Sequence, residues 1–411
     1  MIKELYLKNW KSFSPSRIYI DPLTVLIGTN ASGKSNLLDA FWFLSQIAKG
    51  RTVEYVFNEI RGGREWLIRK GFSEATLLVV LSKDIHGIEY CYEVDLKRAD
   101  DKIWIAKESL KQIDHKRDVV SVNIKTQQST ISSVETTLFR SISDLTKPYV
   151  SVYSRRSKQG PDKNYQLSRT TSVLSQISST DVRKEIKDGA SFVCDELSNI
   201  FVLNPIPNNM RGYSKLSEIL QEDASNMAGV LSAMEDEKRK NVEERLTNYL
   251  RGLPERDIKK VWTERFGPFN EDVILLCEEQ WRGNEVTKID SRSMSDGTLR
   301  FLAIATAIMT RPKGSLLIVE EIDNGLHPSR TSELIRMLKE MGEERSIDIL
   351  CTTHNPVMID ELGVEMIPIV FFVKRDAKTG GSVVEPVEEL SNLPKLLAQY
   401  TLGDLMTEGK L

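Results

Sequence analysis

An excess of charge of either sign is missing from this chain, because 56 lysines and arginines stand against 59 aspartates and glutamates. The net charge of −3 excludes a protein that binds a polyanion over its whole surface, so any nucleic-acid contact has to come from a local patch. No apolar run approaches the roughly 20 residues that cross a bilayer, and the first residues lack the apolar core of a signal peptide. We therefore expect a cytoplasmic protein without a membrane partner.

Cysteine and histidine are also scarce, at four residues each. Cys91, Cys194, Cys277 and Cys351 lie far apart without a C-x-x-C pair, which indicates reduced thiols in core positions. The scattered histidines give no support to a zinc site. With 411 residues, the chain is long enough for a large core and for two lobes or domains.

One glycine-rich segment stands out near the start of the chain. Residues 28–35 read Gly-Thr-Asn-Ala-Ser-Gly-Lys-Ser, which is the G-x-x-x-x-G-K-S spacing of a phosphate-binding loop. The apolar run at 22–27 predicts a buried strand before the loop, and the apolar period over 35–44 predicts a helix after it. Backbone N–H groups and the positive end of that helix would face phosphates. Lys34 would contact the β- and γ-phosphates, and the Ser35 hydroxyl would bind Mg²⁺.

The chain divides into three expected segments. Residues 1–110 are rich in strands and include an alternating hairpin, which a purely parallel nucleotide-binding fold does not contain. Residues 111–270 are polar, and the patterns at 180–200 and 225–250 predict helices, so we expect a mainly helical insertion without a long coiled coil. Residues 271–411 return to α/β alternation, with apolar strands typical of a parallel sheet. The fold class is therefore α/β, with a nucleotide-binding lobe split between the two ends of the chain.

Two adjacent carboxylates follow the apolar strand at 316–319. Because side chains alternate along a strand, the two acids serve different roles. Glu320 would hold Mg²⁺, and Glu321 would polarise the attacking water, although a solvated strand end is the plain alternative. The next apolar strand is followed by His354, which can hydrogen-bond a γ-phosphate or the catalytic water, or serve a structural role. His327, just beyond the acids, fits a catalytic loop and a structural turn equally well.

A second anion site is expected at residues 293–298, Ser-Met-Ser-Asp-Gly-Thr, which open another helix. Ser295 and Gly297 would lie at the N-terminus of that helix, where backbone N–H groups attract anions. One phosphate loop needs only one phosphate cradle. The second cradle therefore indicates ATP shared between two subunits.

These motifs together resemble the ABC-type ATPases, and within them the branch of SMC-, RecF- and overcoming-lysogenization-defect (OLD)-like AAA family ATPases. Asn30 and Asn36 of the loop are characteristic of that branch, as are the motifs Asn-Gly-Leu-His-Pro at 324–328 and Thr-His-Asn-Pro at 353–356. The resemblance covers the two ends of the chain. It implies an ABC-type ATPase head with an antiparallel β lobe, a helical insertion, and ATP and Mg²⁺ as cofactors.

The resemblance also implies which residues meet the nucleotide. Residues at both ends of the chain would contact it: Asn30, Gly33, Lys34, Ser35, Asn36, Ser295 and Gly297. In a head-to-tail homodimer or higher oligomer, the last two would contact the γ-phosphate that Lys34 of the other subunit holds. Glu320 replaces the usual Asp, and its longer arm would still bind Mg²⁺ but could slow turnover. Asp296 replaces the second glycine of the transporter-type signature. Gln46 is a weak candidate for the family's metal-contacting glutamine.

The middle segment is similar to that of small bacterial ATPases of anti-phage defence operons, in which a stretch like Asp-Ala-Ser-Asn-Met-Ala at 223–228 recurs. The residues after His354 leave no room for the nuclease domain of OLD-like proteins. The resemblance thus implies a sensor or regulatory scaffold whose effector, a nuclease or toxin, is a separate protein. The alternative is a RecF- or SMC-like clamp that binds DNA during repair or recombination, whereas a transporter subunit fits less well.

A basic stretch at 147–169 offers a local DNA contact, by phosphate binding and aromatic stacking. A solvated loop or a contact with a partner protein explains the same composition. The residues concerned are Lys147, Arg155, Arg156, Lys158, Lys163 and Arg169, with Tyr149, Tyr153 and Tyr165 between them.

Overall fold

The chain forms two compact units in a computed structural model that describes residues 1–83, 87–100, 102–123, 128–147, 149–155, 162–252, 258–280 and 285–410. The first unit comprises Met1–Ile20, Asn30–Ile200 and Val373–Glu385. The second comprises Asp21–Thr29, Phe201–Phe372 and Pro386–Leu411. Each unit therefore contains residues from both ends of the chain.

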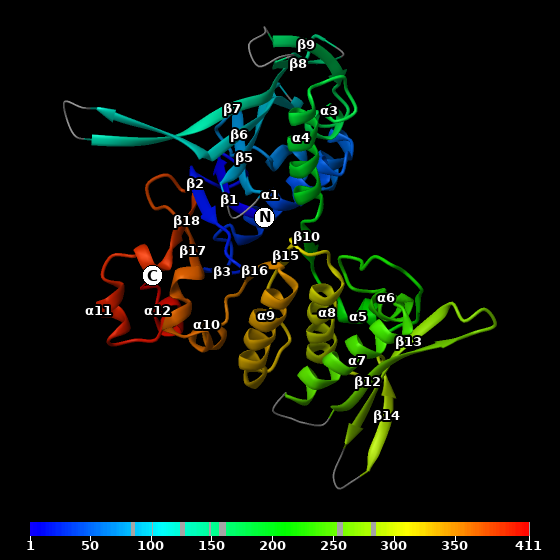
Figure 1. Cartoon of the computed structure of the whole chain (residues 1–411). Helices are drawn as coiled ribbons and strands as arrows, with labels where there is room; N and C mark the ends of the chain where they lie inside the picture. Colours follow the sequence, from blue (N-terminus) through cyan, green and yellow to red (C-terminus); the bar gives the residue numbers. More distant parts are fainter. Residues whose placement is uncertain are drawn as a thin grey trace. The chain divides into compact units, whose positions relative to one another are not determined.

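An eight-stranded antiparallel sheet is the framework of the first unit, in the order β2-β1-β4-β5-β6-β7-β8-β9 (Figure 1). Burial alternates along β4, where Ala75, Leu77, Val79 and Leu81 point into the core and the residues between them are less buried. The strands are β1 (Ile2–Lys8), β2 (Ser16–Tyr19), β4 (Glu74–Ser82), β5 (Ile88–Ala99), β6 (Lys102–Asn123), β7 (Gln128–Ser143), β8 (Tyr149–Arg155) and β9 (Asp162–Ser168).

Helices of the same unit pack against this sheet. A Cβ atom on Gly189 of α4 would lie 2.6 Å from Cδ1 of Leu138 and 2.9 Å from Cε1 of Tyr90, so glycine permits the close approach of helix and sheet. α1, which follows the phosphate loop, is buried along almost its whole length. The helical elements are α1 (Lys34–Ala48), α2 (Val53–Glu59), η1 (Arg64–Trp66), α3 (Val173–Ile177) and α4 (Lys184–Ser198).

A parallel sheet lies at the centre of the second unit, with strands in the order β10-β15-β16-β3-β17. Every residue of β3, β15 and β16 is buried, as expected for strands that helices cover on both faces. The strands are β3 (Leu23–Ile27), β10 (Phe201–Leu203), β15 (Leu316–Val319), β16 (Asp348–Thr352) and β17 (Val370–Arg375). The end of β17 belongs to the first unit, where β18 (Ser382–Pro386) is next in the strand order.

A smaller antiparallel sheet and a set of helices complete the second unit. The sheet has the order β11-β13-β12, and β14 also pairs with β13. Its strands are β11 (Ser214–Lys215), β12 (Ile258–Phe266), β13 (Asp272–Gln280) and β14 (Val286–Asp290). The helical elements are α5 (Pro207–Met210), α6 (Met227–Ala233), α7 (Asp236–Arg251), α8 (Asp296–Thr310), η2 (Pro328–Arg330), α9 (Thr331–Arg345), α10 (Pro356–Leu362), η3 (Val364–Ile369), η4 (Val387–Glu389), α11 (Leu393–Leu397) and α12 (Leu402–Thr407).

The expected α/β class with an antiparallel lobe is confirmed, including the β4–β5 hairpin. The two compact units cut across the expected segments 1–110, 111–270 and 271–411. The expectation of a mainly helical segment is wrong for its first part, because β6, β7, β8 and β9 extend the antiparallel sheet there. Their Ser- and Thr-rich composition resembles that of loops, but pairing with neighbouring strands decides the outcome. Among the described residues, no helix is long and apolar enough to cross a membrane.

Candidate functional site

The phosphate loop connects the end of β3 to the start of α1. Gly28, Ala31 and Gly33 have φ angles of 148°, 62° and 121°, which is the region that glycine tolerates best. A Cβ atom on Gly33 would lie only 2.4 Å from Oγ of Ser382, so a side chain has no room there. Gly28 and Thr29 belong to the second unit. Residues 30–36 belong to the first, and among them Lys34 and Ser35 lie at the start of α1.

Asn36 forms hydrogen bonds within the first unit through its side chain and its backbone carbonyl. Its side-chain Nδ2 donates to Oγ of Ser12 at 2.8 Å, and its backbone carbonyl accepts the indole N–H of Trp10 at 2.8 Å. Trp10 is fully buried, so the first turn of α1 is fixed to the segment that follows β1. The expected nucleotide contact of Asn36 therefore stays a prediction, and its side chain has a second role in holding Ser12.

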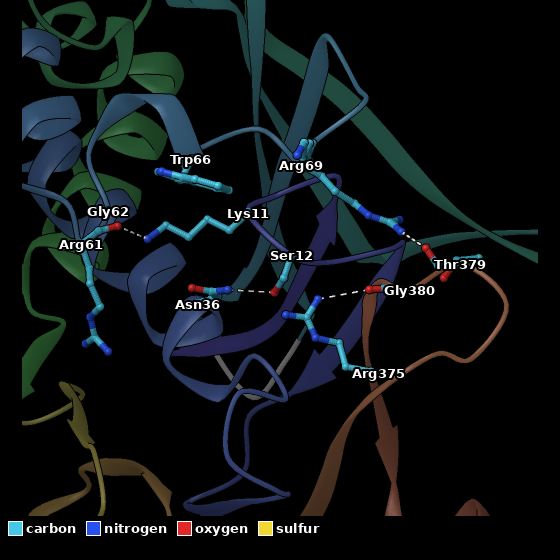
Figure 2. A pocket seen from close by; sticks show the side chains of 11 residues that line it. Lys11, Ser12, Asn36, Arg61, Gly62, Trp66, Arg69, Arg375, Thr379 and Gly380 are labelled. Carbon is cyan, nitrogen blue, oxygen red and sulfur yellow. Dashed lines mark hydrogen bonds between the residues drawn. The ribbon is translucent and has the colours of Figure 1, made fainter.

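A pocket of about 620 Å³ opens in the first unit beside the phosphate loop, where Ser12 and Asn36 form part of its wall (Figure 2). Trp66 is 60% exposed and presents its indole to the pocket. Of the described residues that line it, none is acidic. Five are cationic: Lys11, Arg61, Arg69, Lys70 and Arg375. Such a lining attracts a polyanion with an aromatic part.

Among the described residues that line this pocket, Lys11 is the one cation with a deeply buried side chain. Its Nζ lies 2.5 Å from Oδ2 of Asp39 and donates to the carbonyl of Arg61 at 2.6 Å. Burial lowers the pKa of the Lys11 ammonium, and the neighbouring Asp39 carboxylate opposes that shift. Lys11 therefore fixes the Arg61–Gly62 turn, while the side chain of Arg61 itself is 52% exposed. The sequence did not point to this pocket, because its cations come from segments without a shared motif.

The carboxyl ends of β3, β15 and β16 meet at one edge of the parallel sheet in the second unit. The register places Leu26 opposite Thr352 and Val319 opposite Cys351. Gly28, Glu320 and Thr353 therefore leave neighbouring strands at the same edge, which is where ligands bind in open α/β sheets. Segments from both ends of the chain, predicted from sequence to form one split nucleotide-binding lobe, thus meet at this edge within the second unit.

Glu321 lies in a turn with a positive backbone φ angle. It has a φ angle of 47°, in the left-handed region that costs a non-glycine residue free energy. Its backbone N–H donates to Oγ1 of Thr352 at 2.8 Å, which fixes the turn. Its carboxylate lies 3.8 Å from Nδ1 of His354, and both side chains are about half exposed. The structure thus brings the predicted base and the predicted histidine together.

The segment that contains Ser295 and Gly297 forms a helix N-terminus, as expected. Ser295 is the N-cap of α8 and accepts the backbone N–H of Thr298 at 3.1 Å. A Cβ atom on Gly297 would lie 2.7 Å from the carbonyl of Gly325, so the turn after the acids packs directly on this helix end. Buried Arg330 adds a hydrogen bond of 3.2 Å from Nη1 to Oγ1 of Thr298.

Arg211 holds the loop before α8 and was not identified from sequence. Its Nη1 donates to three backbone carbonyls, those of Ser291 (3.4 Å), Arg292 (2.9 Å) and Met294 (2.7 Å). Its Nη2 pairs with Asp296, which explains an acid at this position of the motif. The arginine lies 80 residues or more before the loop, so no local pattern signals it.

Two weaker sequence candidates have other positions. Gln46 lies near the end of α1, 11 residues after Ser35, which is about 16 Å along a helix. It therefore cannot share a metal ion with Ser35, and this candidate is wrong. His327 caps η2 and its Nδ1 accepts the backbone N–H of Ser329 at 3.3 Å, so the structural-turn interpretation describes its observed contacts.

The basic stretch is divided between two faces of the β8–β9 hairpin. The register pairs Tyr149 with Ser168, Tyr153 with Asn164 and Val152 with Tyr165, so Tyr165 faces away from the other two tyrosines. Arg156 and Lys158 lie outside the described residues, as does the side chain of Arg155. On one face the guanidinium of Arg140 lies 5.5 Å from the ring centroid of Tyr153, and on the other the Nζ of Lys163 lies 4.7 Å from that of Tyr165.

The donor set fits ATP and Mg²⁺. Among the described residues, no three His, Cys, Asp or Glu side chains converge on a common metal site. Mg²⁺ typically uses one or two protein oxygens and completes its shell with phosphate and water. The Ser35 hydroxyl and the Glu320 carboxylate are donors of that kind, and the left-handed backbone at Ala31 and Gly33 is typical of an anion-binding turn.

Comparison with known proteins gives one family and several solved structures. The family model of the AAA ATPase domain matches residues 1–359. A crystal structure of the SMC head bound to the C-winged helix domain of ScpA matches with 16% identity and a TM-score of 0.50, over 93% of this chain and 97% of that chain. This likeness shows the fold.

Two further SMC heads match less closely in three dimensions. The SMC head domain from Thermotoga maritima has 17% identity and a TM-score of 0.44, over 94% of this chain and 98% of that chain. A head domain with an extended coiled coil, bound to the C-terminal domain of ScpA and derived from Pyrococcus furiosus, has 14% identity and a TM-score of 0.49, over 97% and 99%. No curated protein matches the chain.

Proposed function

Because the chain belongs to the AAA ATPase domain family, we propose that it binds and hydrolyses ATP with Mg²⁺. The observation that carries the proposal is the phosphate loop beside the cationic pocket. Phosphates would lie against the N–H groups of residues 30–35, and the nucleoside would enter the pocket and stack on the exposed indole of Trp66. Asp39, behind the lining, pairs with Lys11 and Arg61. The remaining cations, Arg69, Lys70 and Arg375, leave an excess of positive charge that favours a triphosphate over a neutral ligand.

Each residue of the proposed ATP site has its own role in hydrolysis. Lys34 would neutralise the β- and γ-phosphates, and Ser35 with Glu320 would hold Mg²⁺, which supplies charge neutralisation when bound. Glu321 would accept a proton from the attacking water. His354, 3.8 Å from the Glu321 carboxylate, would orient that water or donate to the γ-phosphate. The left-handed backbone of Glu321 supports this role, because strained residues gather at functional sites.

The second anion cradle supports a site shared between two copies of the chain. Ser295 and Gly297 at the N-terminus of α8 would contact the γ-phosphate that the partner's Lys34 holds. The carbonyls of the preceding loop are occupied by Arg211, which keeps the N-terminal end of α8 in a defined position. An anion at a helix N-terminus gains from the helix dipole as well as from its N–H groups.

Two variants test the ATPase and the shared site. Lys34→Ala should lose ATP binding in calorimetry, because the loop loses its cation, while the exposed Lys8→Ala of the same unit should bind normally. Glu321→Gln should bind ATP without hydrolysing it and accumulate as a dimer in multi-angle light scattering. Glu343→Gln on α9, also exposed, is the matched control. A Glu321→Gln protein that binds ATP and stays monomeric would contradict the proposal that two subunits share the ATP site.

For the biological role, the likeness of residues 223–228 to defence ATPases supports a bacterial anti-phage sensor or regulatory scaffold. An effector nuclease or toxin would be a separate protein encoded nearby. Co-expression with the adjacent gene should protect cells from phage, and Lys34→Ala should remove protection. Protection that persists in the Lys34→Ala strain would contradict an ATP-dependent switch.

A DNA clamp for repair or recombination is the second candidate. Arg140, whose guanidinium lies over the ring of Tyr153 and also pairs with Asp162, favours it, because an arginine and an aromatic ring can contact phosphate and base together. Binding of labelled DNA, followed by anisotropy, should then fall steeply between about 50 and 200 mM salt, and Arg140→Glu should weaken it. Binding that does not depend on salt would refute phosphate contact.

A further inference from the structure

The hairpin of β17 and β18 lies beyond the residues that the family model matches, yet it touches the phosphate loop. Ser382 of β18 is fully buried. Its Oγ donates to the carbonyl of Ser32 at 2.5 Å and lies 2.8 Å from Oγ of Ser12. Its backbone N–H donates to the carbonyl of Ser12 at 2.7 Å, so the strand runs along the segment that also holds Asn36.

A second residue of the hairpin reaches the neighbouring peptide. Nε of Arg375 donates to the carbonyl of Ala31 at 3.3 Å, and its Nη1 donates to the carbonyl of Gly380 at 3.1 Å, which ties the side chain to the hairpin turn (Figure 2). Two successive carbonyls of the loop, those of Ala31 and Ser32, are thus held by two side chains of one hairpin.

The planarity of the peptide bond turns these contacts into a constraint on the opposite side of the loop. In a trans peptide the C=O of one residue and the N–H of the next point in opposite directions. Holding the carbonyls of Ala31 and Ser32 against the hairpin therefore directs the N–H groups of Ser32 and Gly33 away from it. Together with positive φ angles at Ala31 and Gly33, this orientation forms a concave row of donors that suits an anion.

We propose that Ser382 and Arg375 are positioning residues of the phosphate loop, and that the β17–β18 hairpin is a working part of the nucleotide site. Ser382 acts through the peptide of Ser32, and Arg375 acts through the peptide of Ala31 in addition to the charge that it contributes to the pocket lining. The inference rests on the proposed ATP site. It adds that phosphate affinity depends on a segment outside the family match, through hydrogen bonds that orient the donors before ATP arrives.

Ser14 provides a matched control for Ser382. Its hydroxyl lies 3.2 Å from Oγ1 of Thr379 and accepts from Nη1 of Arg69 at 2.8 Å, and Arg69 keeps a second bond to the carbonyl of Thr379. None of the hydrogen bonds of Ser14 in the described structure reaches the loop. Calorimetry on the full chain should show ATP and inorganic tripolyphosphate bound about tenfold more weakly by Ser382→Ala, the effect of one lost hydrogen bond, and normally by Ser14→Ala. Without nucleotide, both variants should melt at the same temperature.

Amide exchange separates positioning from a general loss of structure. In nucleotide-free protein, Ser382→Ala should speed exchange across residues 30–34 and leave α1 beyond its first turn unchanged. Arg375→Ala, at an exposed side chain, repeats the test if Ser382→Ala does not fold. If the unchanged chain and Ser382→Ala bind ATP and tripolyphosphate equally, the positioning role is wrong while the ATP site stands. If the unchanged chain binds neither, the proposed function fails and the inference fails with it.

Discussion

Replacing Arg211 with alanine should loosen the loop before α8 by an amount that the contacts allow to be estimated. The bonds to the carbonyls of Arg292 (2.9 Å) and Met294 (2.7 Å) have normal lengths, whereas that to Ser291 (3.4 Å) is long. Met294 is buried, so its carbonyl would lose its donor away from bulk water. The ion pair with half-exposed Asp296 adds little.

An orphaned buried carbonyl costs about 1–3 kcal/mol, and two good bonds are lost here. The Arg211 side chain is 27% exposed, so water can replace part of what the guanidinium provides. We therefore expect about 2–3 kcal/mol of local stability to disappear. Since each 1.4 kcal/mol is a factor of ten, amide exchange in the loop should speed up by roughly 30- to 150-fold.

Hydrogen–deuterium exchange of residues 291–299, read by mass spectrometry, measures this directly. Arg245→Ala is the control, because Arg245 forms a bidentate pair with exposed Glu344 that holds no backbone carbonyl. ATP-dependent dimerisation should weaken in Arg211→Ala, whereas the affinity of the Arg211→Ala monomer for ATP should not change. Exchange in this loop equal to that of the Arg245→Ala control would refute the reasoning.

Two further predictions concern the first unit. Trp66→Ala should weaken ATP binding by roughly 5- to 150-fold in calorimetry, since base stacking contributes about 1–3 kcal/mol. Tripolyphosphate binding should be unaffected, and Trp262→Ala in the other unit should bind both normally; equal loss for both ligands would contradict stacking. Glu108 is fully buried, and its carboxylate accepts from the hydroxyl of Tyr92 (2.6 Å) and the backbone N–H of Val173 (2.8 Å). Burial raises the pKa of Glu108, against the lowering effect of these donors, so its contribution to stability is full below the unfolded pKa and falls as pH rises through the folded one. The unfolding free energy of the unchanged chain, measured with urea, should therefore fall relative to that of Glu108→Gln as pH rises above about 4.5. The difference between the two should change by at most about 1.4 kcal/mol per pH unit. A difference that is constant between pH 4 and 7 would argue against it.

The local elements of the site follow from residues that are neighbours along the chain. Phosphate-loop spacing, with glycine at positions of positive φ, specifies a strand, a turn and a helix in consecutive residues. The apolar runs before Glu320 and His354 likewise identify buried parallel strands, and parallel strands place their carboxyl ends at one edge. These inferences succeed because each depends on backbone geometry that neighbouring residues set.

The distant side chains that complete those elements are known only from the folded chain. Ser382 is 350 residues from Ser32, and Arg211 is 83 residues from Met294, so their hydrogen bonds follow from packing that no local period encodes. The strands from β6 to β9 make the same point, because a Ser- and Thr-rich stretch becomes sheet when an existing edge accepts its N–H and C=O groups. Local pattern fixes conformation, whereas pairing across the chain fixes the surroundings in which each functional group works.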